Sequence, residues 1–436
     1  MNSYKKRILD NLLPKKLESA GAVVLEGAKW CGKTTTAEQI AQSIVYMSEP
    51  SKVEQNILYS RIQPNKILDG ATPRLIDEWQ IAPQLWDAIR FNVDHAGGLG
   101  KFILTGSAVP PQTDEMHHTG TGRFAWLKMR PMTLWESGES SGAVSLAKLF
   151  ESGRTDGVDA KALDLDEMAY IVCRGGWPQA VSMTGRRAAL EQAFNYVDAV
   201  AESDISRVDG VRRDARLTRR ILKSYARLQG TQATAAVIKA DMASAEVASF
   251  DDDTLYAYLG ALKKIFVIED AEAWCPNLRT KTAIRSAETR YFVDPSIAVA
   301  ALGLGPGDLV NDLPTFGLAF ECLAIRDLRV YAQALHGEVR HYLDRSGLEC
   351  DAVVHLRNGQ YGLVEIKTGG KELVEKGVAS LQTLSKKIGA AKSLPPPAFR
   401  MILTAVGEYA YTRKEDGIVV CPISALGCRA GREDNE

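Results

Sequence analysis

The residues with the clearest chemical pattern lie near the start of the chain. Gly27 and Gly32, followed directly by Lys33 and Thr34, fit the spacing G-x-x-x-x-G-K-[ST]. Two glycines at this spacing let the backbone curl until successive N–H groups point at one anionic group. The lysine can then reach the outer phosphates of a nucleotide, and the threonine hydroxyl can hold Mg²⁺. The pattern therefore predicts a loop that binds ATP together with Mg²⁺.

The elements expected around this loop fit that role. Residues 23–25 form a short apolar run typical of a buried strand, and residues 35–45 carry apolar side chains at helical spacing. A strand, a glycine loop and a helix are the setting that the motif requires, and the helix N-terminus adds partial positive charge. The residues expected to hold the nucleotide are Gly27, Ala28, Lys29, Trp30, Cys31, Gly32, Lys33, Thr34 and Thr35.

Two more strands are expected to end beside the loop. The first ends in Asp77, which is placed to hold the metal with Thr34, and in Glu78, which can polarise the attacking water as a general base. The second, residues 101–107, ends in small polar residues, of which Thr105 or Ser107 could bond the γ-phosphate or orient water. For Ser107, a glycine turn capped by a serine is an equal alternative.

One arginine is expected to act on the nucleotide. Arg123 could stabilise charge on the γ-phosphate, either in its own subunit or in a neighbouring one. Alternatively, it is a surface arginine that follows the polar segment 112–121, and the residues alone leave the two interpretations open.

Composition limits the class of protein. The chain has 436 residues, enough for two to four domains, and its 53 basic residues nearly balance 54 acidic ones, so attraction to a polyanion along the whole chain gains no support. No apolar run is long enough to cross a bilayer, and the N-terminus lacks the apolar core of a signal peptide. Seven cysteines without paired spacing favour reduced thiols over a disulfide frame or a zinc site. These features predict a cytoplasmic protein that does not associate with membranes.

The middle of the chain is predicted to be mainly helical. Residues 137–164 lack periodicity and are expected to form a loop or linker, whereas residues 166–200 look helical with a break at 175–178. Residues 215–264 read as successive helices, and residues 265–268 as a strand, which is similar to a winged helix. The last of these helices, residues 254–264, offers few groups that could read base edges.

A basic stripe lies within this helical region. Five cations spaced by three or four residues would share one face of a helix, and contact with a phosphate backbone is the functional interpretation. A solvated face paired with acidic neighbours such as Asp204 and Asp214 is the favoured alternative. The cations are Arg212, Arg216, Arg219, Lys223 and Arg227.

The last part of the chain carries a second group of chemically suited residues. Glu365 and Lys367 lie on one side of a predicted strand, because side chains alternate, and Asp351 lies on the preceding strand of a hairpin that closes near residues 358–359. The two carboxylates could bind Mg²⁺, Lys367 could orient or activate water, and Glu321 could complete the metal shell from a helix. An E-x-K triplet is also a common surface ion pair, so the triplet by itself is weak support.

These motifs together resemble a known family. The segments GAKWCGKT, RLIDEWQ, FILTGS, GRFAWLKMRPMTLWE and RGGWPQAV look like those of prokaryotic AAA+-type P-loop ATPases, which commonly end in a PD-(D/E)XK, restriction-endonuclease-like domain. The resemblance implies an α/β protein with an ATPase core (residues 1–140), a linker and helical lid (141–210), a winged-helix-like module (211–275) and a nuclease-like domain (276–436). It implies Walker A and Walker B elements, and a sensor at Thr105 or nearby.

Two functions follow from this organisation. In the first, an Mg²⁺-dependent ATP hydrolase acts as a molecular switch or motor coupled to a C-terminal domain that acts on nucleic acid. In the second, the ATPase regulates a protein partner, and the nuclease-like domain serves only for binding. The intact set Asp351, Glu365 and Lys367 favours the first, whereas the near-neutral charge favours the second. Nuclease activity and assembly into an oligomer stay open.

Overall fold

The computed structural model describes residues 4–95, 97–107, 120–243, 251–276, 287–391 and 394–428. The chain divides into two compact units, one comprising Met1–Pro131, Val200–Asp214 and Ala257–Val267, and the other Met132–Ala199, Ala215–Tyr256 and Ile268–Glu436. These units do not follow the four segments expected from the sequence, whose boundaries stay a prediction. Part of the polar segment 112–121 lies outside the described residues.

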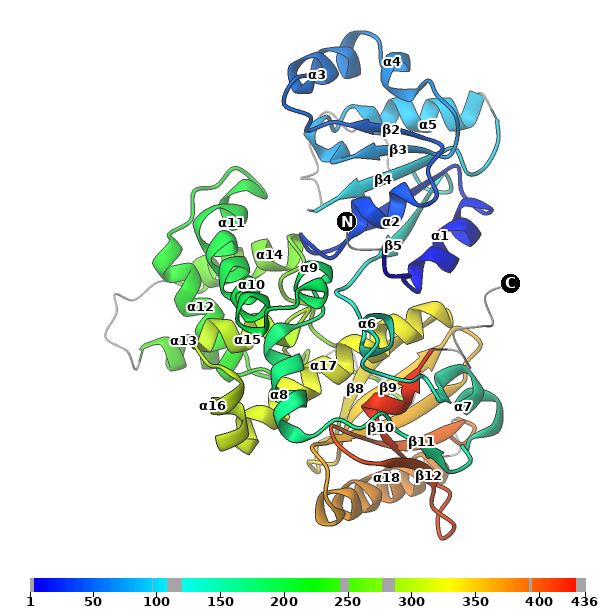
Figure 1. The fold of residues 1–436 in the computed structure, drawn as a ribbon, viewed down its shortest axis with the longest axis vertical. Helices are drawn as coiled ribbons and strands as arrows, with labels where there is room; N and C mark the ends of the chain where they lie inside the picture. The colour runs from blue at the N-terminus through cyan, green and yellow to red at the C-terminus, as the bar shows by residue number, and fades with distance from the viewer. Residues whose placement is uncertain are drawn as a thin grey trace. The chain divides into compact units, whose positions relative to one another are not determined.

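A parallel sheet forms the centre of the first unit (Figure 1). Its spatial order is β2-β3-β4-β1-β5, so the strand that precedes the phosphate loop lies between the fourth and fifth strands. All four pairings are parallel, which confirms the α/β class. The strands are β1 (Ala22–Glu26), β2 (Ser43–Tyr46), β3 (Arg74–Asp77), β4 (Phe102–Gly106) and β5 (Phe124–Lys128).

The helix predicted for residues 35–45 is shorter than expected. α2 spans Lys33–Glu38, and the chain then enters β2, where Ile44 pairs with Leu75 and Val45 with Ile76. The prediction was wrong at Ile44 and Val45 because β-branched residues suit a strand as well as a helical stripe, and only pairing with β3 decides between them.

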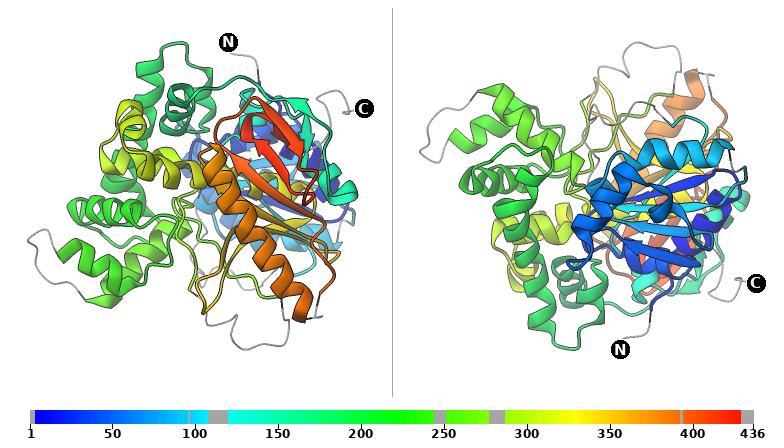
Figure 2. Two further views of the ribbon diagram at one scale, coloured as in Figure 1. Left: turned by 90° about the horizontal axis from the view of Figure 1, so that it is seen from below. Right: turned by 90° about the horizontal axis from the view of Figure 1, so that it is seen from above.

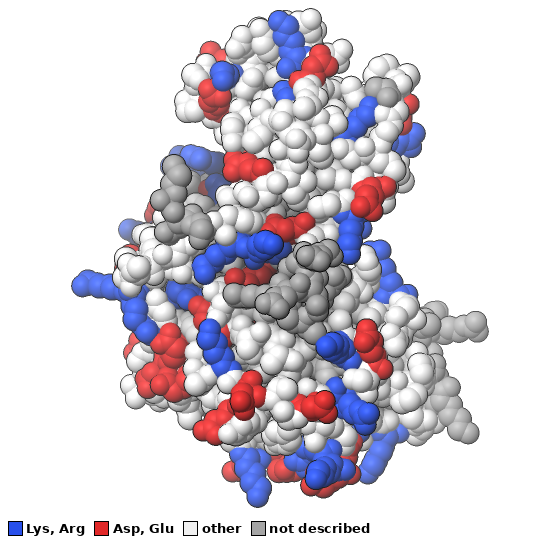
Figure 3. Space-filling view, turned by 45° about the vertical axis from the view of Figure 1, so that its right-hand side comes forward, with Lys and Arg blue, Asp and Glu red and all other residues white. Residues whose placement is uncertain are grey.

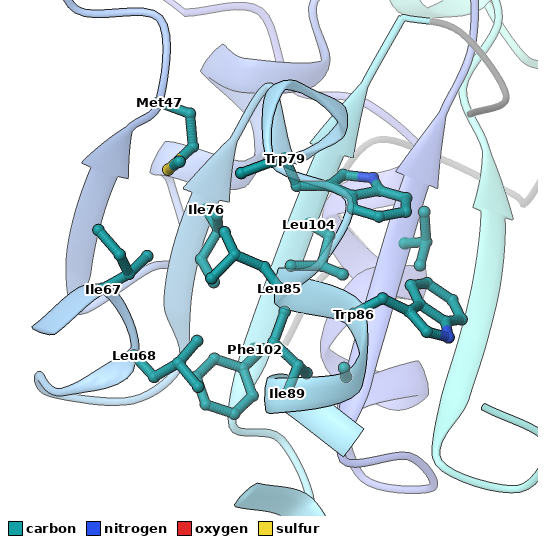
Figure 4. Packing of buried hydrophobic residues seen from close by; sticks show 13 residues of the cluster. Met47, Ile67, Leu68, Ile76, Trp79, Leu85, Trp86, Ile89, Phe102 and Leu104 are labelled. Atoms are coloured by element: carbon teal, nitrogen blue, oxygen red, sulfur yellow. The ribbon is translucent and has the colours of Figure 1, made fainter. Parts of the chain in front are cut away.

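Aromatic side chains pack the core of this unit. Trp79 lies in the 3₁₀ turn Trp79–Ile81, and Trp86 lies in α5 (Leu85–His95); both are buried against the sheet beside Ile76 and Leu104 (Figure 4). Trp86 also stacks on Phe124 of β5, with ring centroids 3.7 Å apart. This packing fixes the turn that follows β3, and therefore the position of the residues directly after that strand. The other helices here are α1 (Leu9–Leu17), α3 (Val53–Ile62), α4 (Asn65–Leu68) and α11 (Ile205–Arg207).

A mixed sheet organises the second unit (Figure 2). Its order is β7-β12-β13-β11-β10-β9-β8, with β10–β11 and β11–β13 parallel and the other pairings antiparallel. Leu381 and Leu384 of α18 (Lys371–Ala391) pack on Leu363 and Ile402 of the sheet. The strands are β7 (Val158–Asp159), β8 (Gly337–Leu343), β9 (Glu349–Leu356), β10 (Tyr361–Lys367), β11 (Phe399–Thr404), β12 (Tyr409–Thr412) and β13 (Val419–Pro422).

The helices of the second unit come before, between and after the strands of this sheet along the chain. The expected helical region with a break at residues 175–178 is present as α8, α9 and α10. The strand expected at 265–268 is absent from the described structure, where Ile268 forms an isolated bridge to Phe292. The helices are α6 (Leu134–Ser137), α7 (Leu146–Ser152), α8 (Leu165–Arg174), α9 (Pro178–Ser182), α10 (Arg186–Ala199), α12 (Ala215–Arg227), α13 (Ala235–Ala243), α15 (Pro295–Leu302), α16 (Pro306–Asn311), α17 (Leu313–Ala334) and α18 (Lys371–Ala391). A further helix, α14 (Asp252–Lys264), is divided between the units, with Ala257 and the residues after it in the first.

The segment predicted to be a linker, residues 137–164, is built into the second unit. Val144 pairs with Leu426 between β6 (Val144–Ser145) and β14 (Leu426–Gly427), and Asp159 pairs with Tyr409 at the edge of the mixed sheet. The prediction of a loop or linker missed α7 and these short strands, because the strands find their partners more than 240 residues later in the chain.

A buried ion cluster ties distant parts of the second unit together. The Arg326 guanidinium donates to Asp294 Oδ2 at 2.8 Å and to Asp327 Oδ1 at 2.7 Å, and all three side chains are almost completely buried. Asp327 also accepts the N–H of Leu134 at 2.9 Å, and Asp294 that of Gly176 at 3.0 Å. One arginine therefore organises two carboxylates that in turn hold two separate backbone segments.

Replacing Arg326 with Met should destabilise the second unit by about 3–5 kcal/mol, because it leaves buried carboxylates without their cation. Urea unfolding measures the change. The control is Arg219→Met, which breaks the exposed pair with Asp198 and should cost at most about 1 kcal/mol. Equal losses in the two variants would contradict the special role of the buried cluster.

Candidate functional site

The phosphate loop has backbone geometry that requires its two glycines. Gly27 has φ +152° and Gly32 has φ +101°. A Cβ at Gly27 would lie 2.0 Å from the carbonyl oxygen of Met129, so no larger residue fits without a backbone shift. Lys33 follows at the start of α2, where its buried Nζ donates to the carbonyls of Gly27 at 2.9 Å and Ala28 at 2.8 Å. The loop carbonyls thus hold the Lys33 ammonium inside the curl of the loop.

Three polar side chains meet at the carboxyl ends of the central strands. Asp77 Oδ1 accepts hydrogen bonds from Thr34 Oγ1 and from Thr105 Oγ1, each at 2.6 Å. The parallel register explains the meeting, because Asp77 and Thr105 are paired residues of β3 and β4. Carboxylate and hydroxyl oxygens are ligands that suit Mg²⁺, so the donor set fits that metal. The structure therefore brings Thr34, Asp77 and Thr105 together, and Lys33 directly precedes Thr34 at the start of α2; their roles toward a nucleotide stay predictions.

Glu78 lies in the turn directly after this group. Its backbone is left-handed, with φ +56° and ψ +44°, a conformation that costs a residue other than glycine about 1 kcal/mol. The Gln80 amide donates to its carboxylate. The left-handed turn changes the direction of the Glu78 side chain after β3. Glu78 therefore does not have to point to the face of the sheet opposite to Asp77, as the next residue of a regular strand would. Sequence reasoning missed Gln80, since a glutamine beside an acidic pair has no distinctive spacing.

Arg123 does not join these residues in its own chain. β1 and β5 run parallel, with Ala22 paired to Phe124 and Glu26 paired to Lys128. Arg123 precedes β5, whereas the phosphate loop follows β1. The two therefore lie at opposite ends of these neighbouring parallel strands. A rise of ~3.3 Å per residue along the strands separates them by about 16 Å. The guanidinium instead donates to Asp94 Oδ1 at 2.7 Å, and this bond lowers the pKa of Asp94. A role for Arg123 toward a neighbouring subunit stays a prediction.

Arg7 is a residue of this region that sequence reasoning missed. Its buried guanidinium donates to the carbonyl oxygens of Cys31, inside the phosphate loop, and of Arg130, each at 2.8 Å. Nearby, the Tyr4 hydroxyl donates to Asp10 at 2.6 Å. Burial of the Tyr4 hydroxyl and its bond to Asp10 raise the pKa of Tyr4. The first residues thus brace the loop, a contact for which their sequence carries no signal.

The second predicted site also comes together. Lys367 Nζ donates to Asp351 Oδ2 at 3.1 Å and lies 2.7 Å from Glu365 Oε2. Asp351 Oδ2 also accepts the N–H of Ile366 at 2.6 Å. The β9–β10 hairpin produces this arrangement, and its turn contains Gly359 with φ +86°, as the sequence predicts.

Glu321 is linked to this group from α17. It accepts a hydrogen bond from the Tyr291 hydroxyl. Burial, together with the nearby charge of Asp351, raises the pKa of Glu321 and that of Glu365 to about 8 each. The Asp351 and Glu365 carboxylates raise the pKa of Lys367 despite its burial. The ammonium is therefore the main cation that offsets the carboxylates.

The donor set of this second site fits a hard divalent cation only in part. Its carboxylate oxygens are suitable ligands, but Lys367 contacts two of the carboxylates directly. Within the residues that the structure describes, no group of three or more His, Cys, Asp or Glu side chains is arranged to hold a metal ion. Metal binding by Glu321, Asp351 and Glu365 stays a prediction that requires the ammonium to move.

The basic stripe on α12 is partly neutralised. Arg219 pairs with Asp198 at 2.8 Å and Arg227 with Asp241 at 2.5 Å, rather than with the acidic neighbours expected from the sequence. On the face drawn in Figure 3, basic and acidic side chains are interspersed. The two ion pairs of α12 leave less of its charge available to a phosphate backbone.

Three parts of the chain match family models. Residues 19–137 match an AAA domain, residues 165–308 a domain of unknown function (DUF8612) and residues 316–426 another domain of unknown function (DUF4143). The phosphate loop, Asp77 and Thr105 all lie inside the AAA match. This part of the chain is therefore a P-loop ATPase domain of the AAA type. The match over residues 316–426 does not address the restriction-endonuclease-like assignment. The two matches to domains of unknown function do not address the winged helix either.

Related proteins add no assigned activity. The uncharacterized proteins Mb2031c of Mycobacterium bovis and Rv2008c of Mycobacterium tuberculosis are each 22% identical to this chain over 370 residues, covering 84% of it and 75% of their own length. Among solved structures, the Walker-type ATPase PABY2304 of Pyrococcus abyssi is similar, with 14% identity and a TM-score of 0.40 over 67% of this chain and 94% of that one. Among the described helices, none combines the length and apolar character needed to cross a membrane.

Proposed function

We propose that this chain binds ATP with Mg²⁺ at the phosphate loop, hydrolyses it, and uses the nucleotide state as a molecular switch. The observation that carries the proposal is the meeting of Thr34 and Thr105 on one oxygen of Asp77, next to Lys33 at the start of α2. An AAA-type domain over residues 19–137 supports it independently.

Each residue of the site has a distinct task in this proposal. Lys33 neutralises the outer phosphates, and the loop N–H groups hold them. Thr34 and Asp77 would hold Mg²⁺, which offsets the charge that develops on the γ-phosphate. Thr105 orients either the water or the phosphate, and Glu78 accepts the proton of the attacking water. The Gln80 amide keeps the Glu78 carboxylate in place meanwhile.

Lys33→Ala should weaken ATP binding about tenfold or more, because it removes charge-assisted hydrogen bonds to phosphate. Isothermal calorimetry measures the affinity. Lys52→Ala is the control, because Lys52 is exposed and pairs with Glu49 on the surface of the same unit. Equal affinity in wild type and Lys33→Ala would overturn the proposed site.

Glu78→Gln should lower ATP turnover about 100-fold or more while leaving ATP bound, since it removes the base and keeps the shape of the side chain. Single-turnover hydrolysis and nucleotide retention on the purified protein measure the two effects. Glu54→Gln, exposed in the first turn of α3, is the matched control. Wild-type turnover in Glu78→Gln would mean that another residue activates the water.

A specific observation favours a second activity in the other unit. The order α17, β8, β9, β10, α18, β11 places Asp351, Glu365 and Lys367 in contact, as expected for a restriction-endonuclease-like core. We propose that this group binds a divalent cation and acts on nucleic acid under control of the ATPase. The direct contacts of Lys367 favour the alternative, in which the site is inactive and the unit binds a protein partner.

Thermal melting with and without Mn²⁺ or Mg²⁺ separates these alternatives. A cation bound only to the folded state at 100 times its Kd stabilises by about 2.7 kcal/mol. In the nucleotide-free Asp77→Ala variant, which removes the carboxylate beside the phosphate loop, the cation should therefore raise the melting temperature by several degrees. Adding Asp351→Ala should abolish the shift, and adding Asp159→Ala, exposed on β7, should keep it. No shift in Asp77→Ala, or an equal shift after Asp351→Ala is added, would support the inactive, partner-binding alternative.

A further inference from the structure

A second lysine of the phosphate loop has an acidic partner from far along the chain. Lys29 Nζ donates to Asp204 Oδ1 at 2.5 Å, across 175 residues of sequence. The Asp204 side chain is only 9% exposed, whereas that of Lys29 is 41% exposed. The pair therefore joins a mostly buried carboxylate to a cation that still reaches solvent.

Asp204 lies on a segment that crosses from one unit into the other. Val200–Asp214 belongs to the first unit, whereas α10 before it and α12 after it belong to the second. The segment begins as a π-helix, Val200–Asp204, a form that often marks functional positions. The segment that carries Asp204 is thus joined covalently at both ends to helices of the second unit.

Further contacts anchor this segment within the first unit. Arg213 forms a two-pronged pair with Asp209 at 2.7 and 2.8 Å and also donates to the Ile205 carbonyl at 2.8 Å. The Asp214 N–H donates to the Tyr258 hydroxyl at 2.9 Å. These bonds brace the turn of the segment that carries Asp204, and the Tyr258 hydroxyl ties its end to another part of the first unit.

The backbone of Lys29 belongs to the loop that would surround the phosphates. The neighbouring Ala28 carbonyl accepts from Lys33, and Trp30 on the other side has a left-handed backbone with φ +65°. A triphosphate bound in this loop presents several negative charges to the Lys29 ammonium, whereas Asp204 presents one. Electrostatic attraction at similar distances therefore favours transfer of the ammonium from carboxylate to phosphate.

We propose that Lys29 is a second phosphate-binding lysine and that Asp204 competes with the nucleotide for it. The inference rests on ATP binding at this loop. When Lys29 turns to the phosphates, Asp204 loses a cation in a mostly buried place, which is unfavourable unless the surrounding segment loosens. Nucleotide occupancy is thereby transmitted to Val200–Asp214, and along the chain to α10 and α12.

ATP affinity, measured by calorimetry on the full chain, tests the competition. Asp204→Asn should tighten binding about three- to tenfold, because the lysine no longer has to leave an ion pair. Lys29→Met should weaken binding, and it should do so most strongly in the Asp204→Asn background. If Lys29 served only to pair with Asp204, Lys29→Met would have no effect in that background, and this result would overturn the proposal.

Two further arms keep the test specific. Asp209→Asn breaks the Arg213 pair in the same segment without touching Lys29, and it should leave ATP affinity unchanged. ATP should speed hydrogen exchange of residues 200–214 in wild type but not in Lys29→Met, and no change in wild type would refute transmission. Loss of binding in Lys33→Ala with no effect of Lys29→Met in either background would reject this inference and leave the ATP site intact.

Discussion

The parallel register of the first sheet is the constraint on which the nucleotide site depends. Because Asp77 pairs with Thr105, and Glu26 with Gly106, the carboxyl ends of β1, β3 and β4 meet at one edge. The loop after β1 therefore starts beside a carboxylate and a hydroxyl that come from distant parts of the sequence. A slip of one residue in β3 would turn Asp77 to the opposite face of the sheet and separate it from Thr34.

Much of this site could be predicted because its chemistry is local or follows from strand direction. The glycine spacing fixes the loop, and an acidic or hydroxyl residue at the end of a parallel strand must lie at the carboxyl edge. The β9–β10 hairpin was predictable for a similar reason, since Asn358 and Gly359 mark its turn and alternation places Glu365 and Lys367 on one side. In both cases, short-range rules determine which side chains meet.

The features that could not be predicted depend on tertiary contacts. Ile44 and Val45 suit a helix or a strand until β3 is beside them, and Val144 becomes a strand residue only by pairing with Leu426. An arginine is usually exposed, yet Arg7 is buried, and the backbone carbonyls of Cys31 and Arg130 accept hydrogen bonds from its guanidinium. Periodicity assigns a residue to a face, but it does not identify the partner that the face will meet.

The carboxylate beside the phosphate loop and the carboxylates of the second predicted site differ in how their negative charge is balanced. This difference determines how easily each could bind a cation. Asp77 is met by two neutral hydroxyls, which satisfy its lone pairs but leave its negative charge available to a metal. Asp351 and Glu365 already share the Lys367 ammonium, and burial raises the pKa of Glu365 to about 8. A cation at the second group must displace the lysine or a proton, whereas a cation at Asp77 needs only to replace hydrogen bonds. Electrostatics therefore favours the carboxylate beside the phosphate loop over the second group as the candidate metal ligand.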